Sequence, residues 1–425
     1  MTTSSVKGFR DILPEEAAGR RAVLATASEM LVAYSYREVE LPLLEHGELF
    51  ARTIGESTDI VEKEMYAFED RDGSLLALRP EGTASLVRAY IEAGLSRSLP
   101  VARLYYQGPM FRRERPQKGR FRQFTQIGAE LIGRNDAGAD AESISLAADI
   151  CSAAGVEGFR IEINSLGDQQ CRPAYREALV AFGREHIAEL CDDCRSRIER
   201  NPLRLLDCKV EGCRTLMGAA PMMGDQLCDP CRAHHDSVLE ILDASGIEVV
   251  VWPSMVRGLD YYCRTAFELI AEGLGAQDAI GGGGRYDGLV AKLGGPDLAG
   301  VGFALGVERM LMAAGSQATD AGPEILVAPL CAEAAATAAS LARRLRQAGR
   351  RVELGSAERR LKAQMKSADK TGVAFVVIIG EQELAGGSAT VRDMAAGQDL
   401  PACFPLMATG AGAIAAMEGG GRDEA

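Results

Sequence analysis

Three arginines lie in strand-like, glycine-rich surroundings. Arg112 ends one extended run, Arg257 opens the segment Arg257–Tyr262, and Arg309 follows the run Gly302–Glu308. A guanidinium group is always charged and grips phosphate or carboxylate through two parallel hydrogen bonds. Taken singly, each of these residues could instead be a surface or ion-pairing arginine. If they meet on one sheet, they would suit a polyphosphate whose charge develops during a reaction.

Carboxylate, hydroxyl and amide side chains form a second set. The run Phe121–Glu130 alternates, so Gln126 and Glu130 share one face of a predicted strand. Glu81 and Thr83 lie at a strand-to-helix corner. An ammonium group needs several acceptors, and this set supplies them. The alternative is that these side chains form the solvated face of an antiparallel sheet.

Tyrosines and glycines complete the candidate pocket. Tyr261 and Tyr262 could line it or simply pack in a core. Four consecutive glycines precede Arg285 and Tyr286, without the spacing of a dinucleotide-binding fingerprint. Such glycines would leave room for a flat ring against the backbone. A flexible turn is the alternative, but it would not explain the adjacent Arg285-Tyr286-Asp287.

Cysteines point to a metal. Two Cys-x-x-Cys pairs are separated by 228 − 194 = 34 positions, with two single cysteines between them: Cys191 and Cys194, Cys208, Cys213, Cys228 and Cys231. Two such pairs can close a tetrahedral structural zinc site. The loop between them is longer than in a usual zinc ribbon, and six cysteines compete for four places. We predict zinc at the two pairs, with Cys208 and Cys213 as alternates; free thiols in a reducing compartment are the other possibility.

Other common chemistries are missing from the sequence. No Gly-x-x-x-x-Gly-Lys-Ser/Thr phosphate loop and no His-Glu-x-x-His zinc helix occurs. The chain has 4 histidines, and none stands beside a serine or cysteine in a recognisable nucleophile setting. A hydrolase triad therefore has little support.

Length and charge bound the remaining possibilities. A chain of 425 residues suggests two to four domains, and its hydrophobic content of 47% is that of a folded protein. The formal net charge of −13 disfavours non-specific nucleic-acid binding, although basic patches at 111–122 and 341–370 allow local contacts. We expect no membrane span and no export signal, hence a cytoplasmic protein whose 11 cysteines are too sparse for a disulfide scaffold.

The elements that must position these residues are an antiparallel sheet and a separate α/β unit. Val101–Arg113 and Phe121–Ile132 are extended runs joined by a basic segment with Pro116 and Gly119, which predicts a long hairpin with a basic tip. Alternating strand and helix patterns after residue 325 predict a small domain with a mostly parallel sheet. The expected fold class is α+β. We predict four parts: a core from 1–167 and 247–315, a Cys-rich helical insertion at 168–246, a linker at 316–322, and an α/β domain at 323–425 with a frayed tail.

The sequence resembles the histidyl-tRNA synthetase family, which belongs to the class II aminoacyl-tRNA synthetases, over nearly its whole length. Glu38–Arg52, Phe111–Glu130 and Gly302–Arg309 look like motifs 1, 2 and 3 of the class. Arg257–Tyr262 and Gly282–Gly288 are similar to two signatures that set histidine enzymes apart. The last two segments make the resemblance specific, because motifs 2 and 3 alone would give only the class.

The resemblance implies a fold and an activity. The core would be a class II antiparallel catalytic sheet, and the C-terminal domain would bind the anticodon. The activity would be that of a histidine–tRNA ligase, which uses ATP and Mg²⁺ to convert L-histidine to histidyl-adenylate and pyrophosphate. It then transfers histidine to the 3′ end of histidine tRNA. The motif 1 resemblance implies a homodimer.

The resemblance also assigns roles in phosphate and tRNA binding. Arg112 would bridge the histidine carboxylate and the ATP α-phosphate. Arg309 would hold the γ-phosphate, and Arg257 would neutralise charge on the α-phosphate as it becomes five-coordinate. Arg115 and Gln117, at the hairpin tip, would read the tRNA acceptor end. These roles agree with a reaction that needs positioning and charge neutralisation more than an acid–base pair.

The remaining roles concern histidine itself. The α-amino group would be held by Glu81, Thr83 and Gln126. The imidazole would be bound by Glu130 and Tyr262, with Tyr261 and Tyr286 nearby. A pocket with polar partners for the ring nitrogens penalises a wrong side chain, because those partners are then left unpaired.

A second function class stays open. A catalytically silent relative could serve as a regulatory subunit of histidine biosynthesis. Such relatives lose parts of the arginine set and the anticodon domain, whereas this chain keeps Arg112, Arg257 and Arg309 and has the additional domain. We therefore favour the ligase.

Overall fold

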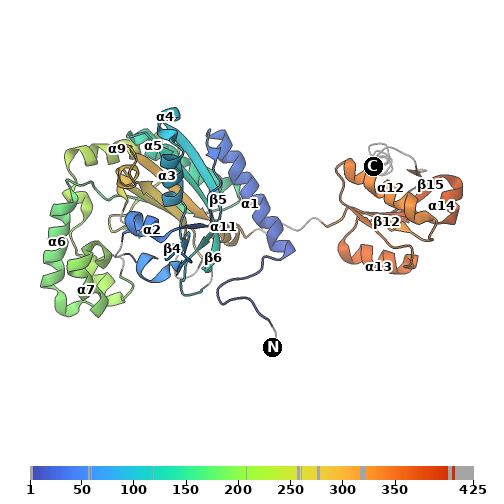
Figure 1. Cartoon of the computed structure of the whole chain (residues 1–425), viewed down its shortest axis with the longest axis horizontal. Helices are drawn as coiled ribbons and strands as arrows, with labels where there is room; N and C mark the ends of the chain where they lie inside the picture. The colour runs from blue at the N-terminus through green and yellow to red at the C-terminus, as the bar shows by residue number, and fades with distance from the viewer. Residues whose placement is uncertain are drawn as a thin grey trace. The chain divides into compact units, whose positions relative to one another are not determined.

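The structure is a computed structural model that describes residues 3–55, 58, 60–117, 119–206, 208–255, 259, 261–274, 278–315, 322–400 and 404–406. The chain forms two compact units, Met1–Ala318 and Thr319–Ala425 (Figure 1). Arg257, positions 316–321 of the predicted linker and the predicted frayed tail lie outside the described residues.

A large sheet forms the centre of the first unit. In the described part of the chain it has 8 strands in the order β1-β5-β6-β11-β10-β9-β7-β8. They are β1 (Arg37–Glu38), β5 (Ala102–Phe111), β6 (Gln123–Ile132), β7 (Arg160–Ser165), β8 (Val250–Val251), β9 (Cys263–Ile270), β10 (Ala279–Arg285) and β11 (Gly300–Gly306). Each neighbouring pair in the series β5-β6-β11-β10-β9-β7 is antiparallel. At the two edges, β1 pairs with β5 and β8 pairs with β7 in parallel. The antiparallel sheet and its β5–β6 hairpin confirm the prediction.

One face of this sheet is covered by helices. They are α1 (Pro14–Ala33), α5 (Ala137–Ala153), α9 (Asp229–Ala244) and α11 (Val307–Ala314). Ile127, Ala129 and Leu131 of β6 lie in the same buried cluster as residues of all four helices. Because side chains alternate along a strand, Gln126 and Glu130 must point to the opposite face. That face carries the candidate site.

Shorter elements border the open face. A second sheet has the order β2-β4-β3, with β2 (Leu44–His46), β3 (Tyr66–Glu69) and β4 (Leu75–Leu78). The helical pieces near it are α2 (Gly47–Ile54), the π-helical turn η1 (Ile60–Glu64), α3 (Thr83–Glu92), α4 (Leu95–Ser98) and α10 (Leu289–Lys292).

A helical lobe, which we define as residues 168–228, is inserted in the chain between β7 and α9. It contains α6 (Arg172–Glu185), η2 (Ile187–Glu189), α7 (Asp192–Arg200), η3 (Pro202–Leu205), α8 (Glu211–Met217) and η4 (Met223–Gln226). Figure 1 shows α6 and α7 to one side of the strands. The lobe has its own buried cluster. By contrast, Val238 and Leu242 of α9 pack in the main cluster of the first unit.

The second unit is an α/β domain. Its sheet has the order β13-β12-β14-β15-β16, and β17 also pairs with β15. The elements are β12 (Ile325–Pro329), α12 (Ala334–Gln347), β13 (Val352–Leu354), α13 (Leu361–Thr371), β14 (Phe375–Ile379), α14 (Glu381–Gly386), β15 (Ser388–Asp393), β16 (Gln398–Asp399) and β17 (Phe404–Pro405). The β13-β12-β14 pairs are parallel as predicted, but β15 to β17 join in antiparallel pairs. Across the residues described in both units, no helix has the length and apolar character needed to cross a bilayer.

Candidate active site

A cavity of about 890 Å³ opens on the uncovered face of the large sheet. Its lining includes seven of the residues predicted to bind histidine or ATP: Glu81, Thr83, Arg112, Gln126, Tyr261, Tyr262 and Arg309. They come from four separate stretches of the chain, which the antiparallel sheet brings together. Two of the three predicted arginines therefore share one cavity, and the third, Arg257, lies outside the described residues.

A transverse row of residues forms the floor of the cavity. Strand register aligns Tyr106, Gly128, Ala304, Gly282 and Glu268 across β5, β6, β11, β10 and β9. A Cβ atom at Gly128 would lie 2.2 Å from the Tyr106 ring, so only glycine lets the ring cover this position. Small residues at the centre of the row leave a flat floor on which a planar ring could rest.

Backbone carbonyls hold Arg112 and Arg309, the two predicted arginines that line the cavity. Arg112 Nε donates to the Pro80 carbonyl at 2.8 Å, and the guanidinium lies 5.4 Å from the Phe124 ring centroid. Arg309 donates to the carbonyls of Gly119 and Ala279. Burial and the positive charge of Arg120 lower the pKa of Arg309. Both guanidinium groups are thus fixed before any ligand arrives, which favours electrostatic stabilisation of an anion.

Glu81 also organises the start of helix α3. Its two carboxylate oxygens accept the backbone N–H groups of Thr83 at 2.6 Å and Ala84 at 3.0 Å. Burial raises the pKa of Glu81, while those N–H donors and the Arg112 charge act in the opposite direction. The carboxylate caps the helix and still lines the cavity, so it can accept from an ammonium group.

Glu130 and Tyr286 lie behind the cavity wall that Glu81 and Thr83 form. The side chain of Glu130 is completely buried, and neither residue belongs to the cavity lining. Glu130 accepts hydrogen bonds from Thr83 Oγ1 and from the Tyr286 hydroxyl, both at 2.6 Å. Burial raises the pKa of Glu130 to about 8, although the two hydroxyl donors lower it. Tyr261 bridges this layer and the cavity, since its ring centroid lies 4.7 Å from Tyr262 and 6.0 Å from Tyr286.

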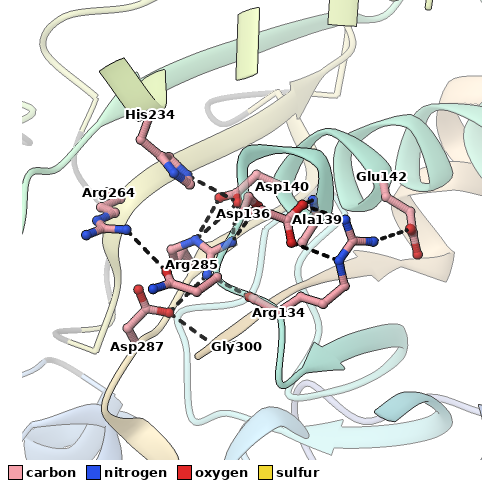
Figure 2. A network of polar contacts seen from close by, with 11 residues as sticks. Arg134, Asp136, Ala139, Asp140, Glu142, His234, Arg264, Arg285, Asp287 and Gly300 are labelled. Atoms are coloured by element: carbon pink, nitrogen blue, oxygen red, sulfur yellow. Dashed lines mark hydrogen bonds and ion pairs between the residues drawn. The ribbon is translucent and has the colours of Figure 1, made fainter. Parts of the chain in front are cut away.

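A buried ion pair fixes the backbone next to Tyr286. Arg285 is fully buried, and it pairs with the equally buried Asp140 of α5 (Figure 2). It also donates to the carbonyls of Arg134 at 3.0 Å and Asp136 at 3.2 Å. His234 Nε2 of α9 lies 3.3 Å from the Asp140 carboxylate. Burial opposes ionisation of Asp140, but His234 and Arg285 outweigh it and lower its pKa.

The hairpin tip contributes to the cavity only in part. Arg115 and Gln117 are exposed, and neither lines the cavity. An antiparallel bridge between Gln117 and Arg120 closes the tip. Gly119 and Arg120 do line the cavity, so the exposed tip lies at its rim.

The predicted four-cysteine metal site is wrong in its grouping. The structure separates the two Cys-x-x-Cys pairs into two clusters: Cys191, Cys194, Cys208 and Cys213 in one, and Asp168, Cys171, Cys228 and Cys231 in the other. The fold brings Cys208 and Cys213 back to the first pair, and it brings the start of α6 to the second. Sequence spacing alone could not show either return.

Sequence patterns did not indicate several of the residues that line the cavity. Tyr106, Glu268 and Asp278 line the cavity, as do basic side chains of the helical lobe: Arg197, Arg204, Lys209 and Arg214. The alternation of β5 could have selected Tyr106, because it faces Gly128 in the hairpin register. Nothing in the spacing of the lobe residues indicates that they approach the sheet.

Among the residues that the structure describes, four atoms of cavity-lining side chains are buried without a hydrogen-bond partner, and one of them, Glu114 Oε2, forms an ion pair with Arg120 at 3.0 Å. The other three are the Tyr106 hydroxyl, Gln126 Oε1 and Asp278 Oδ1. Buried polar atoms are normally paired, so these three suit contacts with a polar ligand.

The antiparallel sheet, the arginine-tipped hairpin and the strand-to-helix turn that carries Arg309 define the catalytic core of a class II aminoacyl-tRNA synthetase. The histidyl-tRNA synthetase profile matches residues 8–310, and an anticodon binding domain profile matches residues 324–401. The chain belongs to the histidyl-tRNA synthetase family.

Individual relatives agree with this family. The chain is 48% identical to a histidine–tRNA ligase of Anaeromyxobacter dehalogenans, over 96% of this chain and 99% of the relative. It is 48% identical to one of Solibacter usitatus, over 93% and 95%. The crystal structure of apo S. aureus histidyl-tRNA synthetase superposes with a TM-score of 0.79 at 35% identity, covering 95% of this chain and 98% of that chain. A Bacillus halodurans structure described as an ATP phosphoribosyltransferase regulatory subunit/histidyl-tRNA synthetase shares only the fold, at 24% identity.

Proposed function

We propose that the cavity is where L-histidine and ATP react to form histidyl-adenylate and pyrophosphate, and that the chain then transfers histidine to the 3′ end of its tRNA. One observation carries the proposal: Arg112 and Arg309 line a single cavity together with Glu81, Thr83 and Gln126. Fixed cations can hold and neutralise a polyphosphate, and the acceptor set can hold an α-amino group.

The roles divide along the floor of the cavity. Arg112 lies beside Glu81, so it suits the carboxylate and α-phosphate that must approach each other, while Arg309 suits the γ-phosphate. Arg257 is proposed for the α-phosphate on the resemblance alone. The flat row at Ala304 and Gly282 suits the adenine ring.

Histidine would occupy the end of the cavity near the tyrosines. Glu81, Thr83 and Gln126 would hold its α-amino group, and Tyr261 and Tyr262 would border its imidazole. Glu130 and Tyr286 would act from behind, because Thr83 and Tyr286 occupy the two oxygens of the Glu130 carboxyl group. The pocket would thus select the imidazole through a buried polar network.

Magnesium would be held by carboxylates on the same side as Arg309. Glu268 and Asp278 line the cavity, and hard cations such as Mg²⁺ prefer oxygen ligands. Within the described chain, the unpaired Asp278 Oδ1 fits such a ligand. When bound, the metal would offset phosphate charge.

The remaining partners are also proposals. Arg115 and Gln117 at the exposed tip would contact the acceptor end of histidine tRNA. The segment Glu38–Arg52 would form a homodimer interface, and Leu43 and Leu44 within it are each 44% exposed. We further propose that the protein works in the cytoplasm, and that the parts 1–167 with 247–315, 168–246 and 323–425 act as catalytic core, insertion and anticodon-binding domain.

The decisive experiment is histidine-dependent exchange of pyrophosphate into ATP with the purified full chain. Exchange is expected for the native protein, and Arg112→Ala should lower its rate by about 10²–10³-fold, as for loss of one charge-stabilising donor. Arg113→Ala is the matched control, because Arg113 is the exposed neighbour on the same hairpin. No exchange by the native protein would leave the silent regulatory subunit as the function.

A further inference from the structure

Two clusters of metal-ligating side chains lie in the helical lobe. The first consists of Cys191, Cys194, Cys208 and Cys213, and the second of Asp168, Cys171, Cys228 and Cys231. Within each cluster, one ligand atom from every residue lies within 4.8 Å of all the others. The sulfur atoms of Cys191 and Cys208 are 3.9 Å apart. That separation is close to the roughly 3.8 Å edge of a tetrahedron with zinc–sulfur distances of about 2.3 Å.

The two clusters repeat the same local structure. Cys191 is the N-cap of α7 with φ −67° and ψ 162°, and Cys228 is the N-cap of α9 with φ −67° and ψ 158°. The second cysteine of each pair, Cys194 or Cys231, lies in the first helical turn and is fully buried. A Cys-x-x-Cys that opens a helix directs both sulfurs to one side, where the positive end of the helix favours thiolates.

Each cluster also contains the same backbone contact. The N–H of Cys191 donates to the sulfur of Cys213 at 3.2 Å, and the N–H of Cys228 donates to the sulfur of Cys171 at 3.2 Å. In both cases the N-cap residue supports a sulfur from a different part of the chain. Hydrogen bonds of this kind orient the ligands of a metal and stabilise their charge.

The fourth ligand differs between the clusters. In the first cluster all four ligands are thiols. In the second, Asp168 supplies a carboxylate, which is oriented by the backbone N–H groups of Gln170 at 2.9 Å and Cys171 at 3.3 Å. Zinc accepts both sets in tetrahedral geometry, and thiolate-rich sites select it over harder cations.

We propose that the chain binds two structural zinc ions, one in each cluster. The alternative, in which the cysteines are only small apolar side chains of the lobe core, does not account for the repeated geometry. Nor does it account for a carboxylate converging with three sulfurs.

The two ions would stabilise different parts of the lobe. The second cluster joins the residues at which the lobe begins and ends, because Cys171 precedes α6 and Cys228 precedes α9. The first cluster lies within the lobe, and its members Cys191 and Cys208 line the cavity beside Lys209. The first ion would therefore fix the wall that the lobe presents to the cavity.

The primary test is the zinc content of the full-length protein, produced with zinc in the medium and freed of loosely bound metal by gel filtration. Elemental analysis should give two zinc ions per chain, and zero or one would overturn the proposal. The count does not depend on catalysis, so it is independent of the pyrophosphate exchange that tests the proposed function.

Single substitutions distinguish two sites from one. Cys213→Ser and Cys171→Ser should each bind one zinc ion, and the double variant should bind none. The control is Cys331→Ser, a partly buried cysteine of the second unit, which should keep both ions. If either single substitution removed all the zinc, the ligands would belong to a single shared site and the proposal would be wrong.

A spectroscopic measurement on the native protein covers the case in which a variant fails to fold. Replacement of zinc by Co²⁺ should give tetrahedral absorption bands and thiolate-to-cobalt charge transfer that saturate at two ions per chain. Mercurial titration of the thiols in the zinc protein should release two ions to a chromophoric chelator. Saturation or release at one ion would contradict the proposal.

Discussion

The Tyr286 hydroxyl donates a 2.6 Å hydrogen bond to Oε2 of Glu130, while Thr83 donates to the other oxygen of the same carboxyl group. Thr83 lines the cavity, but Glu130 and Tyr286 do not. The carboxyl group therefore connects a residue on the wall to a residue in the core.

Tyr286→Phe removes one of the two donors to Glu130. The hydrogen bond lowers the pKa of Glu130, so its loss should raise that pKa further and loosen the wall at Thr83. We expect the KM for histidine in pyrophosphate exchange to rise about tenfold, in line with about 1.5 kcal/mol for a hydrogen bond to an ionisable group, with the KM for ATP unchanged. Tyr90→Phe is the control, because Tyr90 donates its hydroxyl to the Leu99 carbonyl. Equal increases in both KM values would argue against the role of Tyr286.

The pH dependence of stability should report the buried Glu130. Its pKa is raised to about 8 in the folded protein, so folding favours the protonated carboxyl group. The contribution is fully present below the unfolded pKa of about 4.5, and it is lost as the pH rises through the folded pKa. Glu130→Gln cannot ionise, so its Tm should improve relative to the native protein between about pH 5 and about pH 9. Glu157→Gln, at an exposed glutamate, is the control variant. A Tm difference between Glu130→Gln and the native protein that does not change over this pH range would refute the assignment.

Asp140→Asn tests the buried ion pair of Figure 2. The substitution leaves the fully buried Arg285 without its anionic partner on α5. Breaking such a pair costs about 3–5 kcal/mol, which chemical denaturation of the first unit should resolve. The KM for histidine should also rise, since Arg285 directly precedes Tyr286. Asp243→Asn, on the exposed side of α9, should change neither quantity, and an unchanged Asp140→Asn protein would show that the pair is dispensable.

Gln117→Ala separates the two chemical steps. Gln117 is exposed at the hairpin tip and does not line the cavity. We expect the rate of adenylate formation, measured by pyrophosphate exchange, to stay within about twofold of the native rate. The rate of tRNA charging should fall about tenfold, as for the loss of one good polar contact to a nucleic acid. Gln123→Ala, at an exposed residue in the last strand pair before the tip of the same hairpin, should affect neither step. Damage to both steps would mean that the tip supports the cavity.

Sequence patterns predicted those features that depend on local periodicity. The alternation in Val101–Ile132 gave the β5–β6 hairpin, and the face shared by Gln126 and Glu130 follows from the same period. Contacts between distant segments could not be read in this way. The pairing of Arg285 with Asp140 spans 145 positions, and the return of Cys213 to Cys191 spans 22. Such contacts depend on tertiary packing, which spacing does not encode.

The helical lobe begins after β7 and ends at Cys228. The backbone N–H of Cys228 donates a hydrogen bond to the sulfur of Cys171, which lies 57 positions earlier in the chain. Because the two crossing points adjoin, everything between them can be lengthened, shortened or exchanged with little effect on the strands. The sequence of the sheet that forms the cavity floor and the sequence of the helical lobe can therefore diverge at separate rates.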